Sequence, residues 1–319
     1  MEIVILLAGA GLIAAFAGGG GGDDDGAAPP MAEEGPDITQ EGDDTAETLV
    51  GLPELDDVIF GRGGNDTITG DVGNDFLDGN SGNDEVSGDI GDDEVRGGAG
   101  NDLLRGGTGL DTLFGGLDDD TLFGDAGDDT LNGGANADFL DGGEGNDSLD
   151  GVFGIDTLIG GVGMDTLDGG IGNDLLIGIT GDPEDLPTTA EEDSGADVLF
   201  GEEGSDRIIL GSGDEAYGEF EGAVADGAGD TFVVGTWVSA PAPIIRDFDP
   251  DEDAIEVFFD STIDGDPNIA IGMDIVDGED AFIVSFDGDP IVVVQVGMPG
   301  DVLTLGEITL VDVLTLAQT

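Results

Sequence analysis

Large aliphatic residues recur at a fixed interval through the middle of the chain. Between residues 53 and 178 one such residue appears every nine positions, within units dominated by glycine, aspartate and asparagine. The segment around each aliphatic residue is too short for a helix. As a strand of about three residues it would turn one side chain inward and its neighbours outward. Single apolar residues at this spacing can form a core only if the strands of many units stack, so the pattern predicts an all-β repeat structure.

The repeat divides the chain into four parts: residues 1–17, residues 18–52, the repeat region and a C-terminal region. Residues 62–178 split into nine-residue units without an insertion, and PELDDVIFG (53–61) is a weaker unit before them. A stretch at 179–192 interrupts the series, which resumes with DSGADVLFG (193–201) and the looser EEGSDRIIL (202–210). We therefore predict a repeat domain over 53–218. Strand-like runs separated by Gly, Pro and Asp clusters predict a smaller β-rich C-terminal domain over 219–319.

Three positions of each unit are nearly constant: an aspartate, an aliphatic residue two positions later, and a glycine two positions after that. The aspartates are Asp57, Asp66, Asp75, Asp84, Asp93, Asp102, Asp111, Asp120, Asp129, Asp138, Asp147, Asp156, Asp165 and Asp174, followed by Asp197 and Asp206 in the last two units. Glycine supplies the positive φ that lets the chain reverse between short strands. Such turns also bring carbonyl oxygens together with one carboxylate per unit, and these are the oxygen ligands that Ca²⁺ takes.

The units Gly97–Arg105 and Gly169–Ile177 match the pattern G-G-x-G-x-D-x-U-x at every fixed position, where U is a large aliphatic residue. The region thus resembles the repeats-in-toxin (RTX), or haemolysin-type, calcium-binding repeats. The resemblance covers 53–178 and 193–210. It implies a right-handed parallel β-roll in which two units form one coil and calcium ions, on the order of ten, lie in the turns between coils. Alternate aspartates would then line two edges, one row beginning at Asp57 and the other at Asp66.

Composition changes the expected partners. The chain has 75 acidic and 5 basic residues, a net charge of −70, and no lysine, histidine or cysteine. Phosphate contacts require lysine and arginine, so we expect no nucleic-acid binding. Self-repulsion disfavours the compact state unless cations neutralise the charge. We therefore predict that the roll folds when calcium binds.

The same composition bears on catalysis. Without histidine, neither an H-E-x-x-H zinc site nor a Ser-His-Asp triad can form, and no G-x-S-x-G motif is present. We predict a secreted, non-enzymatic calcium-binding protein, extracellular or at the cell surface, with a surface, matrix or adhesive role. Two alternatives stay open: a carbohydrate-active enzyme using carboxylates of the C-terminal domain, and a ligand- or ice-binding adhesin module. The sequence does not indicate an oligomeric state.

The two ends of the chain suggest export. Residues 1–17 are apolar and fit a cleaved signal, a short membrane anchor or an apolar tail. Residues 18–52 are expected to be an acidic flexible linker. The segment Ile244–Ile255 resembles the I-x-D-F segment that comes after the roll in RTX proteins of the type I secretion route, and residues 307–319 are typical of an uncleaved C-terminal secretion signal. The aspartates between 247 and 253 suggest a solvated acidic turn or a further calcium site.

One predicted edge is irregular. Asp118 and Asn136 replace the second glycine of their units, and both residue types tolerate the left-handed conformation. The next turn on that edge, Val152–Ile155, is unusually apolar, which indicates either local packing or contact with a cell-surface or matrix partner. Asparagine often precedes the fixed aspartate, and we expect it to support the turn.

Overall fold

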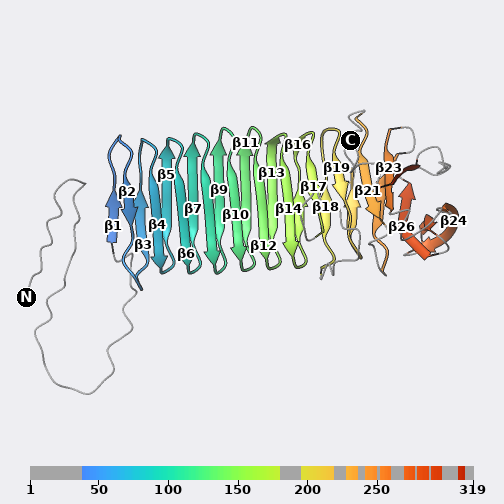
Figure 1. The fold of residues 1–319 in the computed structure, drawn as a ribbon, viewed down its shortest axis with the longest axis horizontal. Helices are drawn as coiled ribbons and strands as arrows, with labels where there is room; N and C mark the ends of the chain where they lie inside the picture. The colour runs from blue at the N-terminus through green and yellow to red at the C-terminus, as the bar shows by residue number, and fades with distance from the viewer. Residues whose placement is uncertain are drawn as a thin grey trace, which may run out of the picture.

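A computed structural model describes residues 38–179, 195–218, 228–235, 241–249, 252–259, 269–276, 279–286, 289–296 and 308–312. The apolar segment 1–17 and most of the interruption at 179–192 lie outside these residues. The described residues are all-β, and no helix among them is long and apolar enough to cross a membrane. The fold is a parallel β-roll, in which successive coils stack into a rod (Figure 1).

Two sheets face each other along the rod, and the chain alternates between them. The first sheet contains, in spatial order, β1 (Ile38–Glu41), β3 (Asp57–Phe60), β5 (Phe76–Ser81), β7 (Glu94–Ala99), β9 (Thr112–Leu117), β11 (Thr130–Ala135), β13 (Ser148–Gly154), β15 (Thr166–Asp168), β18 (Val198–Phe200), β20 (Glu215–Tyr217), β22 (Ile244–Phe248), β26 (Asp289–Val296), β25 (Glu279–Phe286) and β24 (Ile269–Val276), with β16 (Ile171–Gly172) beside β13. The second contains β2 (Thr48–Val50), β4 (Thr67–Val72), β6 (Glu85–Ile90), β8 (Leu103–Thr108), β10 (Thr121–Ala126), β12 (Phe139–Glu144), β14 (Thr157–Val162), β17 (Leu175–Ile177), β19 (Arg207–Ile209), β21 (Thr231–Gly235), β23 (Ala254–Phe259) and β27 (Ile308–Asp312).

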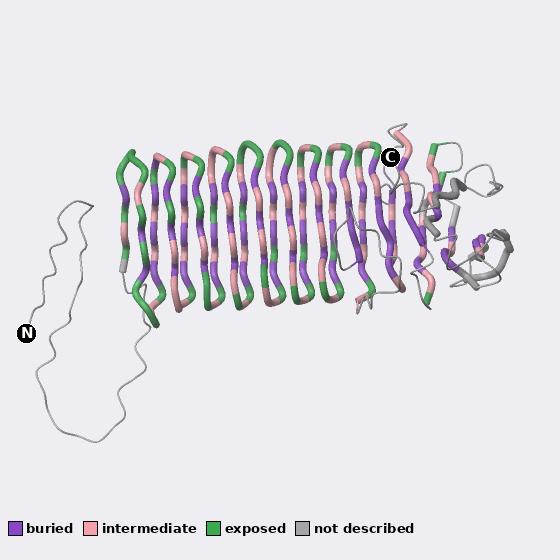
Figure 2. Tube along the Cα trace, in the orientation of Figure 1, coloured by how far each residue is buried: buried purple, intermediate pink, exposed green. Residues whose placement is uncertain are grey.

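The core is a stack of the fixed aliphatic residues. Strands pair in register one coil apart, so Leu104 aligns with Leu122 and Leu122 with Leu140. Each of these three side chains is fully buried. Most repeat strands have six residues instead of the expected three, because the glycine after the core residue and the two residues beyond it continue the pairing. Figure 2 shows the resulting alternation of buried and more exposed positions along every coil, with exposed positions gathered at the turns.

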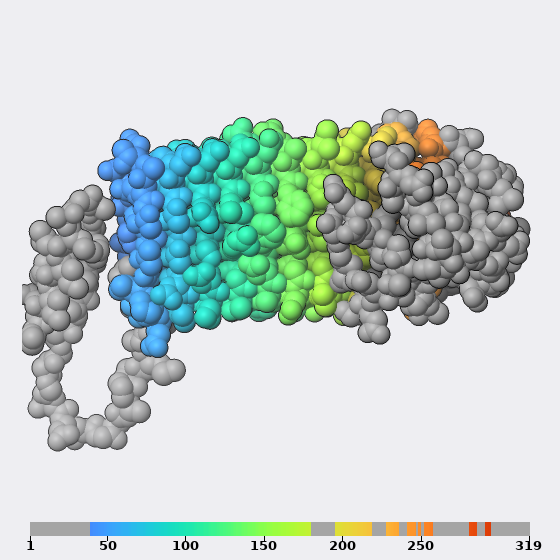
Figure 3. Space-filling model, viewed as in Figure 1, coloured from blue at the N-terminus to red at the C-terminus, as the bar shows by residue number. Residues whose placement is uncertain are grey.

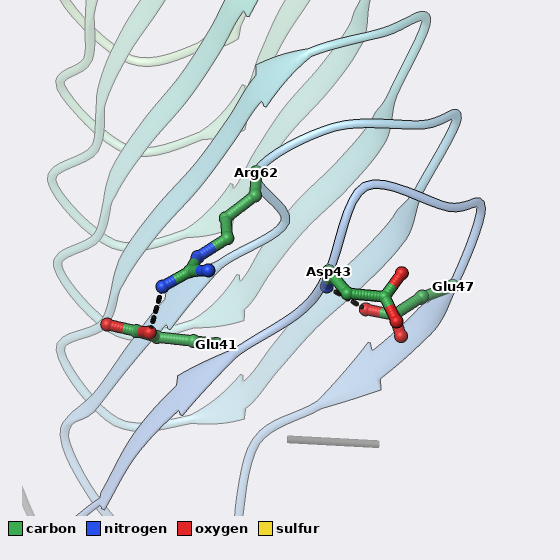
Figure 4. A network of polar contacts seen from close by, with 4 residues as sticks. All are labelled: Glu41, Asp43, Glu47 and Arg62. Carbon is green, nitrogen blue, oxygen red and sulfur yellow. Dashed lines mark hydrogen bonds and ion pairs between the residues drawn. The ribbon is translucent and has the colours of Figure 1, made fainter. Parts of the chain in front are cut away.

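The roll begins earlier than the repeat suggested. Strands β1 and β2 lie inside the segment expected to be a linker, and their parallel pairing with β3 and β4 makes them a first coil. An ion pair between Arg62 and Glu41 ties this coil to the next (Figure 4). In the turn, the Asp43 N–H donates to Glu47 Oε2 at 2.9 Å. The unit GDDTAETLV (42–50) lacks the repeat's aspartate and second glycine, and so its sequence resembles a linker.

Beyond residue 218 the same two sheets continue. Strand β22 extends the first sheet by pairing with β20, and β21, β23 and β27 extend the second, all by parallel pairing. One buried apolar cluster runs from Leu49 to Val294. Strands β24, β25 and β26 then pair antiparallel, which departs from the coil pattern. The segment expected to be a separate domain therefore shares the core and the sheets of the roll.

The residues between β17 and β18 do not interrupt the strand pairing on either side of them. Strand β17 pairs directly with β19, and β15 with β18, as if the intervening residues were absent. Ile177, Ile179, Ile209 and Val233 form a second buried cluster. Ile177 is next to the core residue Leu176 and so points to the outside of the second sheet. The space-filling view shows the coils as parallel bands along the rod (Figure 3).

Candidate metal-binding rows

The fixed aspartates form two hydrogen-bonded rows, one at each edge of the roll. The backbone N–H of each aspartate donates to Oδ1 of the aspartate one coil further on, for example from Asp102 to Asp120 and from Asp120 to Asp138, both at 2.8 Å. The first row joins Asp57, Asp75, Asp93, Asp111, Asp129, Asp147, Asp165 and Asp197. The second joins Asp66, Asp84, Asp102, Asp120, Asp138, Asp156, Asp174 and Asp206. The structure thus brings all the predicted site residues together in the two rows that the resemblance implied.

The second carboxylate oxygen of these residues is buried without a hydrogen-bond donor. From Asp66 to Asp174, Oδ2 of every aspartate in the two rows has no partner among the described residues, and each side chain is at most 3% exposed. A buried carboxylate that lacks a compensating partner carries a large desolvation cost. Because the same Oδ2 atom lacks a partner in every coil from Asp66 to Asp174, the missing partner is a repeated property of the rows.

Each open oxygen packs closely against the first glycine of its turn. A Cβ atom on Gly124 would lie 2.6 Å from Asp129 Oδ2 and 2.5 Å from the carbonyl oxygen of Gly142, and one on Gly151 would lie 2.6 Å from Asp156 Oδ2. A side chain at these glycines would overlap both oxygens, so only glycine allows the carboxylate and the carbonyl to approach each other. The unpartnered carboxylate oxygen and the nearby carbonyl are hard oxygen donors of the type that calcium takes, so the residues present fit calcium. No group of three or more acidic side chains that could hold a metal ion by themselves occurs in the described residues. Backbone carbonyls and water would have to complete the six to eight ligands of Ca²⁺.

Without a bound cation the rows favour protonated carboxyl groups. Burial raises the pKa of Asp120 to about 8, and that of Asp93 and Asp102 to about 7. The backbone N–H from the preceding coil lowers each pKa, while neighbouring carboxylates raise it again. A divalent cation beside Oδ2 would reverse this balance, because an adjacent positive charge stabilises the ionised carboxylate.

A second ladder on the outside of the turns supports the same geometry. Asp56 Oδ1 accepts the N–H of Asn74 at 2.8 Å, Asn74 Oδ1 accepts that of Asp92 at 3.0 Å, and Asp92 Oδ1 accepts that of Leu110 at 2.9 Å. This confirms that asparagine before the fixed aspartate supports the turn. The outer residues border a groove of about 510 Å³ that also exposes the edge of the first row, and the groove is a path by which an ion could enter.

The rows extend past the residues predicted from the repeat. Glu47 takes the aspartate position of the first coil and donates its N–H to Asp66 Oδ1 at 2.8 Å. At the other end Asp197 donates to Asp214 at 3.1 Å, Asp206 to Asp230 at 2.9 Å, and Asp230 to Asp253 at 3.0 Å. Asp214 and Asp230 are buried. Their spacings of 17 and 24 residues from the preceding row member break the period, although an apolar core residue, Phe232, still follows two positions after Asp230.

Backbone N–H groups close the ends of the rows. Leu52 N–H donates to Asp57 Oδ2 at 2.5 Å, and Gly211 N–H donates to Asp214 Oδ2 at 2.6 Å. Asp249 N–H donates to Asp253 Oδ2 at 2.8 Å. At these positions the protein supplies the positive partner that the internal aspartates lack.

The irregular edge keeps its turns. Asp118 and Asn136 have φ of 75° and 83°, which confirms that they adopt the left-handed conformation. Val152 does so as well, with φ of 73°, although a β-branched residue is strained there. Phe153 and Ile155 in the same turn are 54% and 65% exposed. The apolar turn is therefore a surface feature and not part of the core.

Two stacked parallel sheets, with a buried and incompletely paired carboxylate in each regular turn, define a β-roll whose turns fit a cation. The family model described as RTX calcium-binding nonapeptide repeat (4 copies) matches residues 54–86, 87–122, 114–149, 150–182 and 193–215. Across residues 54–215 the chain belongs to this family of RTX calcium-binding repeats. A comparison with curated proteins finds no match.

Proposed function

We propose that the protein is a secreted, non-enzymatic calcium-binding protein whose roll folds when Ca²⁺ binds along the two aspartate rows. The observation that carries this proposal is the buried Oδ2 atom, which has no donor in any coil from Asp66 to Asp174 among the described residues. The proposed ligands are the row aspartates together with glycine carbonyls such as that of Gly142 beside Asp129. Backbone N–H groups cap the first row at Asp57 and Asp214 and the second row at Asp253.

Electrostatics support coupling between folding and binding. The chain has a net charge of −70, and its row carboxylates repeat in every coil with only five arginines to offset them. The five arginines form ion pairs with Glu41, Glu94, Asp125, Glu256 and Glu215, away from the rows. Their charge therefore does not neutralise the buried carboxylates. Calcium supplies two positive charges beside each open oxygen and so removes the repulsion that opposes the coil.

The proposed role is extracellular and structural or adhesive. Calcium modules of the extracellular space need affinities of only about 10⁻⁴–10⁻³ M, which suits sites built from few carboxylates and several carbonyls. The absence of histidine, lysine and cysteine from the sequence removes three of the common nucleophiles and general bases. Weak calcium sites of this kind would fill at extracellular calcium concentrations, and we therefore propose that the protein lies outside the cell or on its surface.

Calorimetric titration of the chelator-treated protein with CaCl₂, followed in parallel by circular dichroism, tests this function. We expect binding of several ions and a gain of β signal that EGTA reverses and that MgCl₂ does not reproduce. Magnesium demands octahedral geometry at shorter distances, which the glycine turns do not offer. An unchanged β signal on addition of EGTA would contradict coupled folding. Assay of culture medium, surface and cell fractions tests the location.

A further inference from the structure

A groove lies on the outer face of the first sheet, where β5, β7 and β9 run side by side (Figure 1). It has a volume of about 540 Å³, within the range of small-molecule sites. Asp78, Asn80, Arg96 and Phe114 line it, and the calcium-row aspartates take no part in it. The groove therefore needs an explanation separate from the rows.

The floor of the groove is backbone. Gly98 and Gly116 occupy successive coils at the position after the first glycine of the unit, with φ of 114° and 117°. A Cβ atom on Gly98 would overlap the carbonyl oxygen of Asn80, and one on Gly116 would overlap that of Gly98. No side chain larger than hydrogen fits at either position without a backbone shift. The floor is consequently flat, and a ring-shaped ligand could approach it closely.

An arginine is fixed between two aromatic rings at the side of the floor. The guanidinium carbon of Arg96 lies 5.0 Å from the ring centroid of Phe76 and 5.6 Å from that of Phe114. Its Nε donates to Glu94 Oε1 at 2.9 Å. Cation–π contacts and this hydrogen bond hold the guanidinium in place. The ring of Phe114 remains 36% exposed and offers an apolar surface beside fixed polar groups.

Asp78 supplies a partly desolvated acceptor across the groove. Burial raises the pKa of its carboxyl group, whereas the backbone N–H of Asn80 and the charge of Arg96 lower it. The carboxylate and the exposed ring of Phe114 line the same groove two strands apart, with Arg96 on the strand between them. Hydroxyl groups of a ligand could donate to Asp78 while an apolar ring face rests on Phe114, and this combination is the one a pyranose presents.

We propose that this groove binds a neutral saccharide, with Phe114 as the stacking surface and Asp78 as the hydroxyl acceptor. Anionic sugars are disfavoured by the net charge of −70. A cationic ligand would meet the fixed guanidinium of Arg96. The inference extends the proposed surface role. It rests on the proposed function only in requiring that the roll is folded.

The second sheet offers a matched control. Phe123 occupies the same position of its repeat and carries Arg105 above its ring at 4.3 Å. That pair lies on the opposite sheet from the groove, so it reproduces the packing of Phe114 without the proposed ligand site. Phe123→Ala therefore reports the general cost of removing a surface phenylalanine from a strand.

Binding is tested with the full chain in saturating CaCl₂, after circular dichroism has established its β signal. The probes are cellotetraose, mannotetraose, chitotetraose and a galactose tetrasaccharide, each titrated by calorimetry. We expect at least one to bind, Phe114→Ala to abolish that binding, Asp78→Asn to weaken it about tenfold, and Phe123→Ala to leave it unchanged. Folded protein that binds none of the four, or that binds equally after Phe114→Ala, overturns the proposal. Either result leaves calcium-coupled folding intact, whereas a roll that ignores calcium yet binds sugar would overturn only the proposed function.

Discussion

Protons should replace calcium in stabilising the roll. Removing calcium at neutral pH leaves ionised carboxylates buried in every coil, and we expect the β structure to be lost. Lowering the pH of the same calcium-free protein to about 5 should restore it, because the buried groups then become neutral. Calcium and acid are thus two alternative ways of removing the same buried charge.

The magnitude can be worked from one row member. Asp102 is 3% exposed, and its pKa is raised from 3.8 to about 7, with burial as the largest cause. A shift of about three pKa units corresponds to roughly 4 kcal/mol of destabilisation when the group is ionised in the folded state. Three such residues would therefore cost about 12 kcal/mol, which is comparable with a typical total stability of about 5–15 kcal/mol.

The direction of the pKa shift sets the sign of the pH dependence. The folded-state pKa lies above the unfolded value, so the folded state binds the proton more tightly. The resulting stability is fully present below about pH 4, the ordinary pKa of aspartate. It is lost as the pH rises through about 7 and 8, the values of Asp93 and Asp120. With calcium bound the dependence reverses, because protons then compete with the ion for the same oxygens.

The assay is circular dichroism of protein freed of calcium by chelating resin, recorded from pH 8 to pH 5 at constant NaCl concentration. The lower limit stays above the pI of about 4.1, which avoids isoelectric precipitation. A parallel series in millimolar CaCl₂ should show β structure at pH 7.5 and weakening calcium affinity in acid. A calcium-free protein that is folded at pH 7.5, or that gains no β signal at pH 5, would refute the reasoning.

Three substitutions test the parts of one coil. Asp120→Asn keeps the Oδ1 acceptor but removes the charge at Oδ2, so calorimetry should show fewer bound calcium ions, whereas Asp119→Asn in the exposed turn should change nothing. Gly100→Ala places a Cβ on the Gly82 carbonyl oxygen, at a residue whose φ is 121°. It should raise the calcium concentration needed for folding, measured by circular dichroism. An effect no larger than that of Ala99→Ser would contradict this. Leu113→Ala should cost about 2–5 kcal/mol of unfolding free energy in urea at saturating calcium, and a loss under about 1 kcal/mol would mean that the core stack is not tightly packed.

The repeat made most of the roll predictable. A fixed interval between Asp66 and Asp174 assigns each aspartate to a turn and each aliphatic residue to the core, because stacking requires equal coil lengths. The sequence alone could not locate Glu47, Asp214 or Asp230. Their coils have altered lengths or a different acid, and only the backbone pairing of β2, β20 and β21 shows that they continue the rows.

The C-terminal strands illustrate a second limit. Strands β22 and β26 pair in parallel although about forty residues separate them in the sequence, and no local periodicity records such a pairing. Composition correctly indicated strands there, but it could not show that they join the two sheets of the roll. The sequence pattern likewise did not show that β24 and β25 pair antiparallel.

The coils before and after the interruption keep the same rotational orientation along the rod. Asp165 donates to Asp197 in the same row although they lie 32 residues apart, against 18 between Asp147 and Asp165, so the extra residues do not rotate the coils beyond them. A nine-residue unit is different, because each unit carries the chain from one sheet to the other. Gain or loss of a single unit would turn every later coil by half a revolution relative to the first, while a change of two units would preserve the orientation. The parity of the repeat count therefore determines whether a feature such as the Phe114 groove and the far end of the rod face the same side.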